Sequence, residues 1–166
     1  AHFLSMVKES VGSEAGSHFI GITDPGSKPE AVAKKENFRH IFYGYPGIGG
    51  RYSALSPFGI VPAALIGLDL QTFLGRAQEM TTLCQETTAQ NNPGVLLGAI
   101  MGVAAKAGRN KLTIVTSAAV HDFGAWLEQL VAESTGKLGK AIIPVDREGL
   151  SSDTAVYGDD RLFVFI

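Results

Sequence analysis

The order of short apolar runs and helix-forming segments constrains the fold of this chain more than any other feature. Residues 18–23 and 39–43 are short apolar runs bounded by turn residues, and residues 29–35 between them begin with proline and continue with helix formers. A helix between two strands returns the chain to the edge of the sheet where the first strand began, so the strands pair in parallel. This alternation predicts an α/β fold with a mostly parallel sheet.

The rest of the chain continues in the same style. Three apolar helices are predicted, at residues 53–67, 69–86 and 94–107. The third is rich in small residues and apolar all round, which predicts a buried helix. A strand at 111–117, a helix at 122–135 ended by Gly136, and strands at 141–145 and 161–166 complete the prediction. Ligands of such a sheet are expected at the carboxyl ends of its strands.

Composition excludes several classes of protein. The chain has 166 residues, enough for one ordinary domain, and its formal charge of −2 gives no nucleic-acid footprint. The apolar run at residues 58–70 is too short to cross a bilayer and includes Pro62 and Asp69, and no signal peptide is visible, so the cytoplasm is the default location. The single cysteine, Cys84, excludes an internal disulfide, argues against a thiolate zinc site and is expected to be semi-buried.

The segment Gly49-Gly50-Arg51-Tyr52-Ser53 is the strongest candidate for a binding site. Two glycines allow a ligand to approach the backbone closely and accept a positive φ at little cost. Arg51 adds a permanent cation with a planar fork of donors, and Ser53 offers its hydroxyl as a helix cap or a polar contact. A glycine pair and a guanidinium at the start of a helix favour an anionic ligand or a developing negative charge.

Gln129 and Glu133 form a second candidate, on the helix predicted to end before Gly136. Four residues apart, they project from the same side of that helix. This side lies at the rim of the apolar stripe predicted to face the core, where a carboxylate is partly desolvated and suits the role of a general base. The alternative is a surface glutamate that forms an ion pair with Lys137. The stripe consists of Phe123, Trp126, Leu127, Leu130 and Val131.

Other motifs favour structural roles. His40 is expected to be a half-buried strand histidine, and His121 a residue of the turn before a helix. The glycines at 47–50 do not fit the dinucleotide-binding pattern, because Tyr52 stands where a third glycine is required. The segment Thr23-Asp24-Pro25-Gly26-Ser27 could cradle an anion, but an ordinary turn is favoured. Three late aspartates lack the spacing of a calcium loop: Asp153, Asp159 and Asp160.

Two of these segments together resemble the phosphoglucose isomerase family. Residues 48–59 (IGGRYSALSPFG) resemble its first signature, and residues 129–137 (QLVAESTGK) resemble its glutamate-bearing helix. Their order and separation also agree, and the similarity extends over most of the chain. Residues 23–26 (TDPG) and 61–64 (VPAA) are most like the isomerase half of bacterial proteins that fuse transaldolase to phosphoglucose isomerase.

The resemblance implies a fold of two sugar-isomerase (SIS) domains, each a three-layer sandwich with a mostly parallel sheet flanked by helices. Residues 1–45 would be the C-terminal tail of the first domain and residues 46–166 most of the second. The implied reaction interconverts glucose 6-phosphate and fructose 6-phosphate through a cis-enediolate. It needs no metal or organic cofactor, and the implied assembly is a homodimer of the full-length protein.

The resemblance also implies roles for individual residues. Glu133 matches the base that moves a proton between the first two sugar carbons, and Arg51 matches the arginine that stabilises the negatively charged intermediate. Gln129 matches a glutamine that contacts the substrate, and Gly50, with Gly49 before it, matches backbone that lies against the substrate. The same chemistry requires a carboxylate base and a fixed positive charge, which agrees with the residue-level reading.

Three parts of the family site are not found in the sequence: the Ser/Thr-rich phosphate loop, the ring-opening histidine taken from a partner subunit, and a late lysine-bearing segment. We therefore expect a fragment of a longer protein that lacks isomerase activity alone. Two alternatives remain open at this point. One is a non-catalytic SIS module that binds phosphosugars for regulation, and the other is a structural or dimerisation segment.

Overall fold

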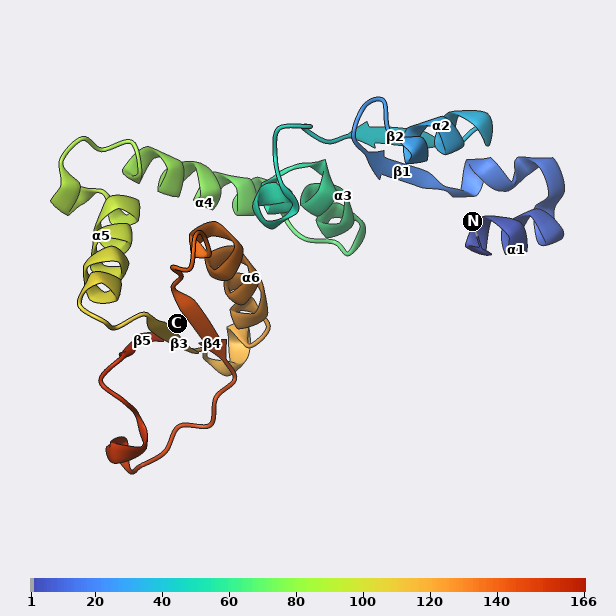
Figure 1. Cartoon of the computed structure of the whole chain (residues 1–166). Coiled ribbons are helices and arrows are strands. Elements are labelled where there is room, and N and C mark those ends of the chain that lie inside the picture. Colours follow the sequence, from blue (N-terminus) through green and yellow to red (C-terminus); the bar gives the residue numbers. More distant parts are fainter. Residues whose placement is uncertain (1) are drawn as a thin grey trace. The chain divides into compact units, whose positions relative to one another are not determined.

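Figure 1 shows the computed structural model, which describes residues 2–166. The chain forms two compact units, one ending at Leu74 and the other running from Gly75 to Ile166. Helix α4 (Leu70–Leu83) spans this boundary, and each unit has its own small parallel sheet. The predicted class, an α/β fold of the SIS type with parallel strands, is confirmed. The division into SIS domains after residue 45 stays a prediction.

The first unit is built around two parallel strands joined by a helix. Strand β1 (Ile20–Thr23) pairs with β2 (His40–Tyr43), with Ile20 opposite His40 and Thr23 opposite Tyr43, and α2 (Lys28–Lys35) connects them. No element is predicted before residue 18, but residues 2–11 form a helix. None of its residues is buried. The other elements are α1 (His2–Val11), η1 (Gly12–His18), η2 (Gly50–Leu55) and α3 (Pro57–Leu65), where η marks a 3-10 helix.

Glu30 ties the start of α2 to strand β2. Ser27 caps the helix by accepting a hydrogen bond from the Glu30 backbone N–H at 3.2 Å. The Glu30 carboxylate accepts hydrogen bonds from the Gly26 N–H and, at 2.8 Å, from the Tyr43 hydroxyl, and it forms a 2.6 Å ion pair with Lys34. The bond to Lys34, followed by those to Gly26 and Tyr43, lowers the pKa of Glu30 to about 2.

The second unit contains a three-stranded parallel sheet, in which β3 (Lys111–Val115) lies between β4 (Ile143–Asp146) and β5 (Arg161–Phe165). Its core lies on the central strand, where Leu112, Thr113 and Ile114 are buried. Helix α6 (Phe123–Thr135) packs against β4, and its start approaches so closely that a Cβ on Gly124 would stand 2.0 Å from Asp146 Oδ1. The elements after α4 are η3 (Ala89–Asn91), α5 (Pro93–Lys106), β3 (Lys111–Val115), η4 (Ala118–Val120), α6 (Phe123–Thr135), β4 (Ile143–Asp146), η5 (Thr154–Val156) and β5 (Arg161–Phe165).

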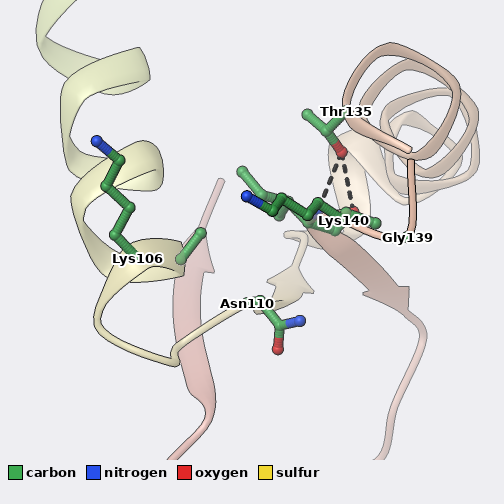
Figure 2. A pocket seen from close by; sticks show the side chains of 8 residues that line it. Lys106, Asn110, Thr135, Gly139 and Lys140 are labelled. Atoms are coloured by element: carbon green, nitrogen blue, oxygen red, sulfur yellow. Dashed lines mark hydrogen bonds between the residues drawn. The ribbon is translucent and has the colours of Figure 1, made fainter. Parts of the chain in front are cut away.

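The connection from α6 to β4 is clamped at its base. Thr135 Oγ1 accepts a hydrogen bond from the Ile142 N–H at 2.9 Å and lies 3.3 Å from the Ile142 carbonyl oxygen, as the dashed lines in Figure 2 show. Inside the loop, Lys137 and Lys140 exchange two backbone hydrogen bonds of 2.9 Å. These bonds place the C-terminal end of α6 beside the amino end of β4.

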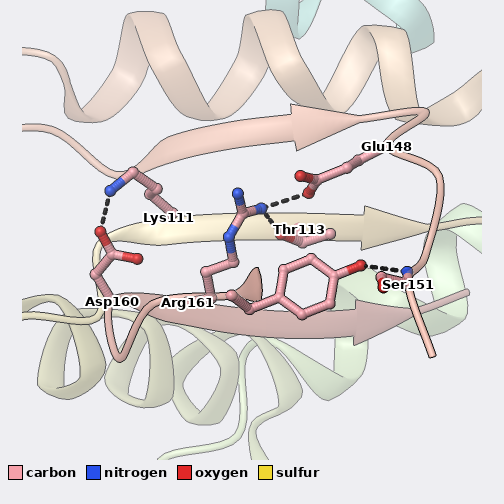
Figure 3. A network of polar contacts seen from close by, with 7 residues as sticks. Lys111, Thr113, Glu148, Ser151, Asp160 and Arg161 are labelled. Carbon is pink, nitrogen blue, oxygen red and sulfur yellow. Dashed lines mark hydrogen bonds and ion pairs between the residues drawn. The ribbon is translucent and has the colours of Figure 1, made fainter. Parts of the chain in front are cut away.

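A polar network over the sheet holds the long segment between β4 and β5 (Figure 3). The Arg161 guanidinium donates to Thr113 Oγ1 at 2.9 Å and forms an ion pair with Glu148. The Tyr157 ring lies 5.2 Å from the same guanidinium, and its hydroxyl accepts a 2.7 Å hydrogen bond from the Ser151 N–H. Arg161 is only 17% exposed, so this pair is better shielded from solvent than an ordinary surface ion pair.

Helix α5 is not the buried helix that its apolar sequence predicts. None of its residues is buried, because α5 contacts chiefly the short turn η3 and no packed layer of the second unit covers it. Cys84, predicted to be semi-buried, is also exposed. Five large apolar side chains of α5 are 48–68% exposed: Val95, Leu96, Leu97, Ile100 and Val103.

Candidate active site

Arg51 lies in the second position of the 3-10 helix η2, directly after the glycine pair. Its side chain is half-buried, and the guanidinium lies 5.0 Å from the centroid of the neighbouring Tyr52 ring. Such a cation–π contact restricts the movement of the guanidinium. The predicted combination of a fixed cation with the start of a helix is present, although the helix is of the 3-10 type.

The glycines act by leaving space rather than by adopting an unusual conformation. Neither Gly49 nor Gly50 has a positive φ; Gly49 has a φ of −69°, which any residue can adopt. A Cβ on Gly50 would meet no atom within 4 Å, and one on Gly49 would meet only Arg51 Nη1 at 3.9 Å. The capacity of these glycines for a positive φ is therefore not used, and their contribution is the open backbone surface.

Two serines hold the turn after Arg51. Ser53 makes a polar contact rather than capping a helix, because its hydroxyl donates to the Gly50 carbonyl at 2.7 Å. Ser56 is the residue that caps α3, accepting a hydrogen bond from the Phe58 N–H at 3.2 Å and donating to the Ser53 carbonyl at 2.7 Å. These side chain–backbone bonds fix the conformation of the segment that carries Arg51.

Gln129 and Glu133 lie together on α6, as their spacing predicts. Gln129 Nε2 donates to Glu133 Oε1 at 3.2 Å, and both side chains are exposed. The exposure differs from the predicted position at the rim of a buried stripe, because the stripe itself is only half-buried and Phe123 at its start is 42% exposed. Lys137 donates to the backbone carbonyl of Glu133 at 2.7 Å, so this contact fixes the main chain at the end of the helix.

The two candidate segments belong to different units. Arg51, with the glycine pair, is in the first unit, and Gln129 and Glu133 are in the second. Their meeting in one site therefore stays a prediction. Within the second unit, Glu133 is in the last turn of α6, which approaches the amino end of β4, and not at the carboxyl end where ligands of such sheets were expected.

The two histidines have structural surroundings. The His40 ring packs on Phe42 with 4.3 Å between centroids, but the side chain is exposed and not half-buried as expected. His121 lies in the turn before α6, as predicted, with Nδ1 3.2 Å from Asp122 Oδ1. Residues 24–27 form a hydrogen-bonded turn, in which the Ser27 N–H donates to the Asp24 carbonyl.

Two buried aspartate oxygens are not predicted from the sequence. Asp24 Oδ1 and Asp146 Oδ1 are buried acceptors with no hydrogen-bond partner within residues 2–166. Each aspartate stands at the carboxyl end of a parallel strand, and a single aspartate after a strand gives no sequence signal that distinguishes this position. In the same residues, no group of three His, Cys, Asp or Glu side chains could hold a metal ion. No helix among them is long and apolar enough to cross a membrane.

Parallel strands joined by helices, with an arginine after a glycine pair and a glutamate at the end of a crossover helix, define an α/β protein of the SIS type. The sequence model of the phosphoglucose isomerase family matches residues 3–157. The chain therefore belongs to the phosphoglucose isomerase family.

Curated relatives agree with this membership. The glucose-6-phosphate isomerase of Carboxydothermus hydrogenoformans is 32% identical over 133 residues, covering 80% of this chain and 29% of the relative. Those of Prochlorococcus marinus strains NATL2A and MIT 9313 are 34% identical over 145 residues and 32% over 155 residues, covering 86% and 91% of this chain. Both matches cover 27% of the relative. The chain thus spans under a third of the length of the relatives it matches.

Proposed function

We propose that this chain supplies the proton-transfer part of a glucose-6-phosphate isomerase active site. Membership of the family supports the reaction. The observation that carries the assignment of the base is the hydrogen bond from Gln129 Nε2 to Glu133 Oε1 on an exposed helix face. A carboxylate that is held by a neighbour and exposed can be approached by a small molecule, as a general base must be.

The proposed chemistry moves one proton between adjacent carbons. The Glu133 carboxylate removes the proton from C2 of the open-chain glucose 6-phosphate, and the electron pair of that C–H bond forms the C1–C2 double bond. The electrons of the C1 carbonyl move to O1, which gives the cis-enediolate. Glu133 then returns the proton to C1, and the proton of the C2 hydroxyl passes to O1, so that fructose 6-phosphate results with no change in oxidation state overall.

Arg51 stabilises the enediolate in this proposal. Negative charge appears on oxygen only after the proton has been removed, so a fixed guanidinium acts on the intermediate more than on the substrate. The exposed backbone at Gly49 and Gly50 lies against the sugar, where a side chain would interfere, and Gln129 contacts both the base and the substrate.

The wider assignment follows from the same family relationship. We place residues 1–45 in the tail of a first SIS domain and residues 46–166 in a second, within a cytoplasmic full-length enzyme that forms a homodimer. The phosphate of the substrate and the opening of the sugar ring are assigned to residues outside this chain. The isolated 166-residue chain is then inactive, and turnover of fructose 6-phosphate by the purified chain, proportional to its concentration, contradicts this.

Replacing the base tests the proposal directly. In a full-length isomerase that carries this segment, Glu133→Gln is expected to lower kcat by about 10²- to 10⁴-fold, the usual contribution of general acid–base catalysis. It should lower equally the exchange of the C2 hydrogen with solvent. Glu128→Gln is the matched control, because Glu128 is exposed on the same helix. Unchanged kcat and unchanged exchange in Glu133→Gln would show that Glu133 is not the base.

A further inference from the structure

The second unit has a hollow, here called the Lys106–Lys140 hollow, at the amino ends of β3 and β4. It has a volume of about 540 Å³ and lies between the end of α5 and the loop after α6. Figure 2 shows that Lys106 projects from α5 and Lys140 from the opposite wall, with Asn110 below them. All of its lining residues belong to the second unit.

The charged side chains that line this hollow are all positive. Lys106 and Lys140 both line it, and no aspartate or glutamate does. Within residues 2–166, neither ammonium forms an ion pair, whereas Lys34 and Lys111 each pair with a carboxylate. The C-terminal end of α5 accounts for a cation at Lys106, because carbonyl groups gather there, but it does not account for a second cation on the facing loop.

The remaining walls restrict the kind of anion that fits. Asn110 is half-buried and offers an amide, while Ala105, Ala141 and Ile142 give apolar surface. The volume falls within the range of about 300–1,000 Å³ typical of sites for small molecules. A phosphate monoester carries a charge of about −1.5 to −2 at neutral pH, which two lysines balance. Lysine is a common phosphate ligand as a point charge.

Hydrogen bonds hold the wall of the hollow at Thr135 and Lys140. Thr135 lines the hollow, and its hydroxyl donates to the Val131 carbonyl at 2.8 Å and accepts a hydrogen bond from the Ile142 N–H at 2.9 Å. Lys140 is held by the two backbone bonds that it exchanges with Lys137. A lysine whose backbone is fixed loses less conformational freedom when a ligand binds than one on an open loop.

We propose that the Lys106–Lys140 hollow binds the phosphate group of a small molecule, either inorganic phosphate or a phosphate monoester. The ligand contacts the two ammonium groups and the Asn110 amide, and an ester places its organic part on the apolar wall. This site is separate from Gln129 and Glu133, which face away from it on α6 by the helical spacing of Thr135 and Glu133. The inference does not depend on the proposed isomerase chemistry, because its readout is binding alone.

Lysine footprinting tests the proposal on the chain itself. The probes are inorganic phosphate and glycerol 3-phosphate, with glycerol as the neutral control. Acetylation of Lys106 and Lys140, read by mass spectrometry, should slow in the presence of either phosphate probe, while acetylation of Lys28 stays unchanged. Equal affinity for the two probes identifies free phosphate as the ligand, and tighter binding of glycerol 3-phosphate identifies an ester.

Variants complete the test. The double variant Lys106→Met/Lys140→Met should bind the phosphate probes at least about tenfold more weakly, which equals about 1.4 kcal/mol. Lys28→Met, a change at another exposed lysine, should bind them as the parent chain does. Glutamine variants at both positions serve where the methionine variants lose helical circular dichroism. Two results overturn the proposal. One is protection of Lys28 equal to that of Lys106 and Lys140. The other is no protection of Lys106 and Lys140 in the folded chain at a probe concentration of about 10 mM, where binding too weak to be useful would already be visible.

Discussion

The carboxamide of Gln129 donates a hydrogen bond to the carboxylate of Glu133 across one turn of α6, with 3.2 Å between Nε2 and Oε1. This contact restricts the rotation of the Glu133 carboxylate. A base must be held in a productive position against its substrate, so in the proposed mechanism the replacement of Gln129 should lower kcat.

The first prediction concerns Gln129→Met in a full-length isomerase that carries this segment. Methionine has a similar length but cannot donate to Glu133 Oε1, so the proposed base is held less firmly and kcat should fall by about tenfold or more. Glu128→Gln, an exposed change on the same helix, should leave kcat unchanged. Steady-state kinetics with fructose 6-phosphate measure both variants. An unchanged kcat in Gln129→Met would show that this hydrogen bond does not position the base.

The second prediction concerns Arg51→Met in the same protein. Loss of a charge that acts on the enediolate should lower kcat by about 10²- to 10³-fold, with a smaller rise in KM. Arg51→Lys should recover part of kcat, since it keeps the charge but loses the fork of donors. Steady-state kinetics with fructose 6-phosphate measure both, and Arg76→Met on exposed α4 is the control. A rise in KM at constant kcat would instead mean that Arg51 binds the substrate and the intermediate alike.

The sequence predicts the elements well and their burial poorly. Strand and helix boundaries such as Lys111–Val115 and Phe123–Thr135 follow from local patterns of apolar and turn residues, which are visible in the sequence. Burial depends on what packs against an element. The apolar surface of α5 gave no indication that the second unit leaves it uncovered.

The candidate site shows the same division. The spacing of Gln129 and Glu133 predicts their contact, because a helix determines which side chains are neighbours at four residues. The cap at Ser56, in place of Ser53, depends on where the 3-10 helix gives way to α3, which residue type alone does not determine. The unpaired oxygens of Asp24 and Asp146 depend on tertiary packing and have no local signal.

The third prediction concerns Asn92, which joins two helices. Its Oδ1 accepts a hydrogen bond from the Val95 N–H at 2.9 Å, and its Nδ2 donates to the carbonyls of Cys84 and Glu86 at 2.7 and 3.0 Å. Asn92→Ala removes all three from a side chain that is 5% exposed, so the free energy of unfolding should fall by about 1–3 kcal/mol. Urea denaturation measures the change. Asn91→Ala, next to it on an exposed turn, should cost much less, and an equal loss would contradict the role of the cap.

The fourth prediction concerns the pH dependence of stability at Glu30. Its pKa in the folded chain is about 2, against an ordinary value of 4.5, chiefly because of Lys34. The stability that this carboxylate contributes is fully present above pH 4.5 and is lost as the pH falls through about 2. The urea midpoint of the parent chain should therefore fall more steeply over this range than that of Glu30→Gln. Glu9→Gln, at an exposed position, should follow the parent chain, and identical slopes for all three would refute the assignment.

The fifth prediction concerns the contact between α6 and β4 at Gly124. A Cβ added there would stand 2.0 Å from Asp146 Oδ1, and the Asp146 side chain is only 6% exposed, so it has little room to move. Gly124→Ala should lower the free energy of unfolding by about 1–3 kcal/mol through this overlap. Gly98→Ala, inside α5 with no atom within 4 Å of the new Cβ, should instead raise it by about 0.5–1 kcal/mol.

A double-mutant cycle separates this overlap from a general effect of alanine on α6. Asp146→Ala removes the carboxylate that the new Cβ meets, and Oδ1 has no hydrogen-bond partner to lose within residues 2–166. Gly124→Ala should therefore cost less in the Asp146→Ala background than in the parent chain, with a coupling of about 1 kcal/mol or more. Urea denaturation of the four proteins measures that coupling. The same cost in both backgrounds would mean that the start of α6 does not pack on the end of β4 as closely as described.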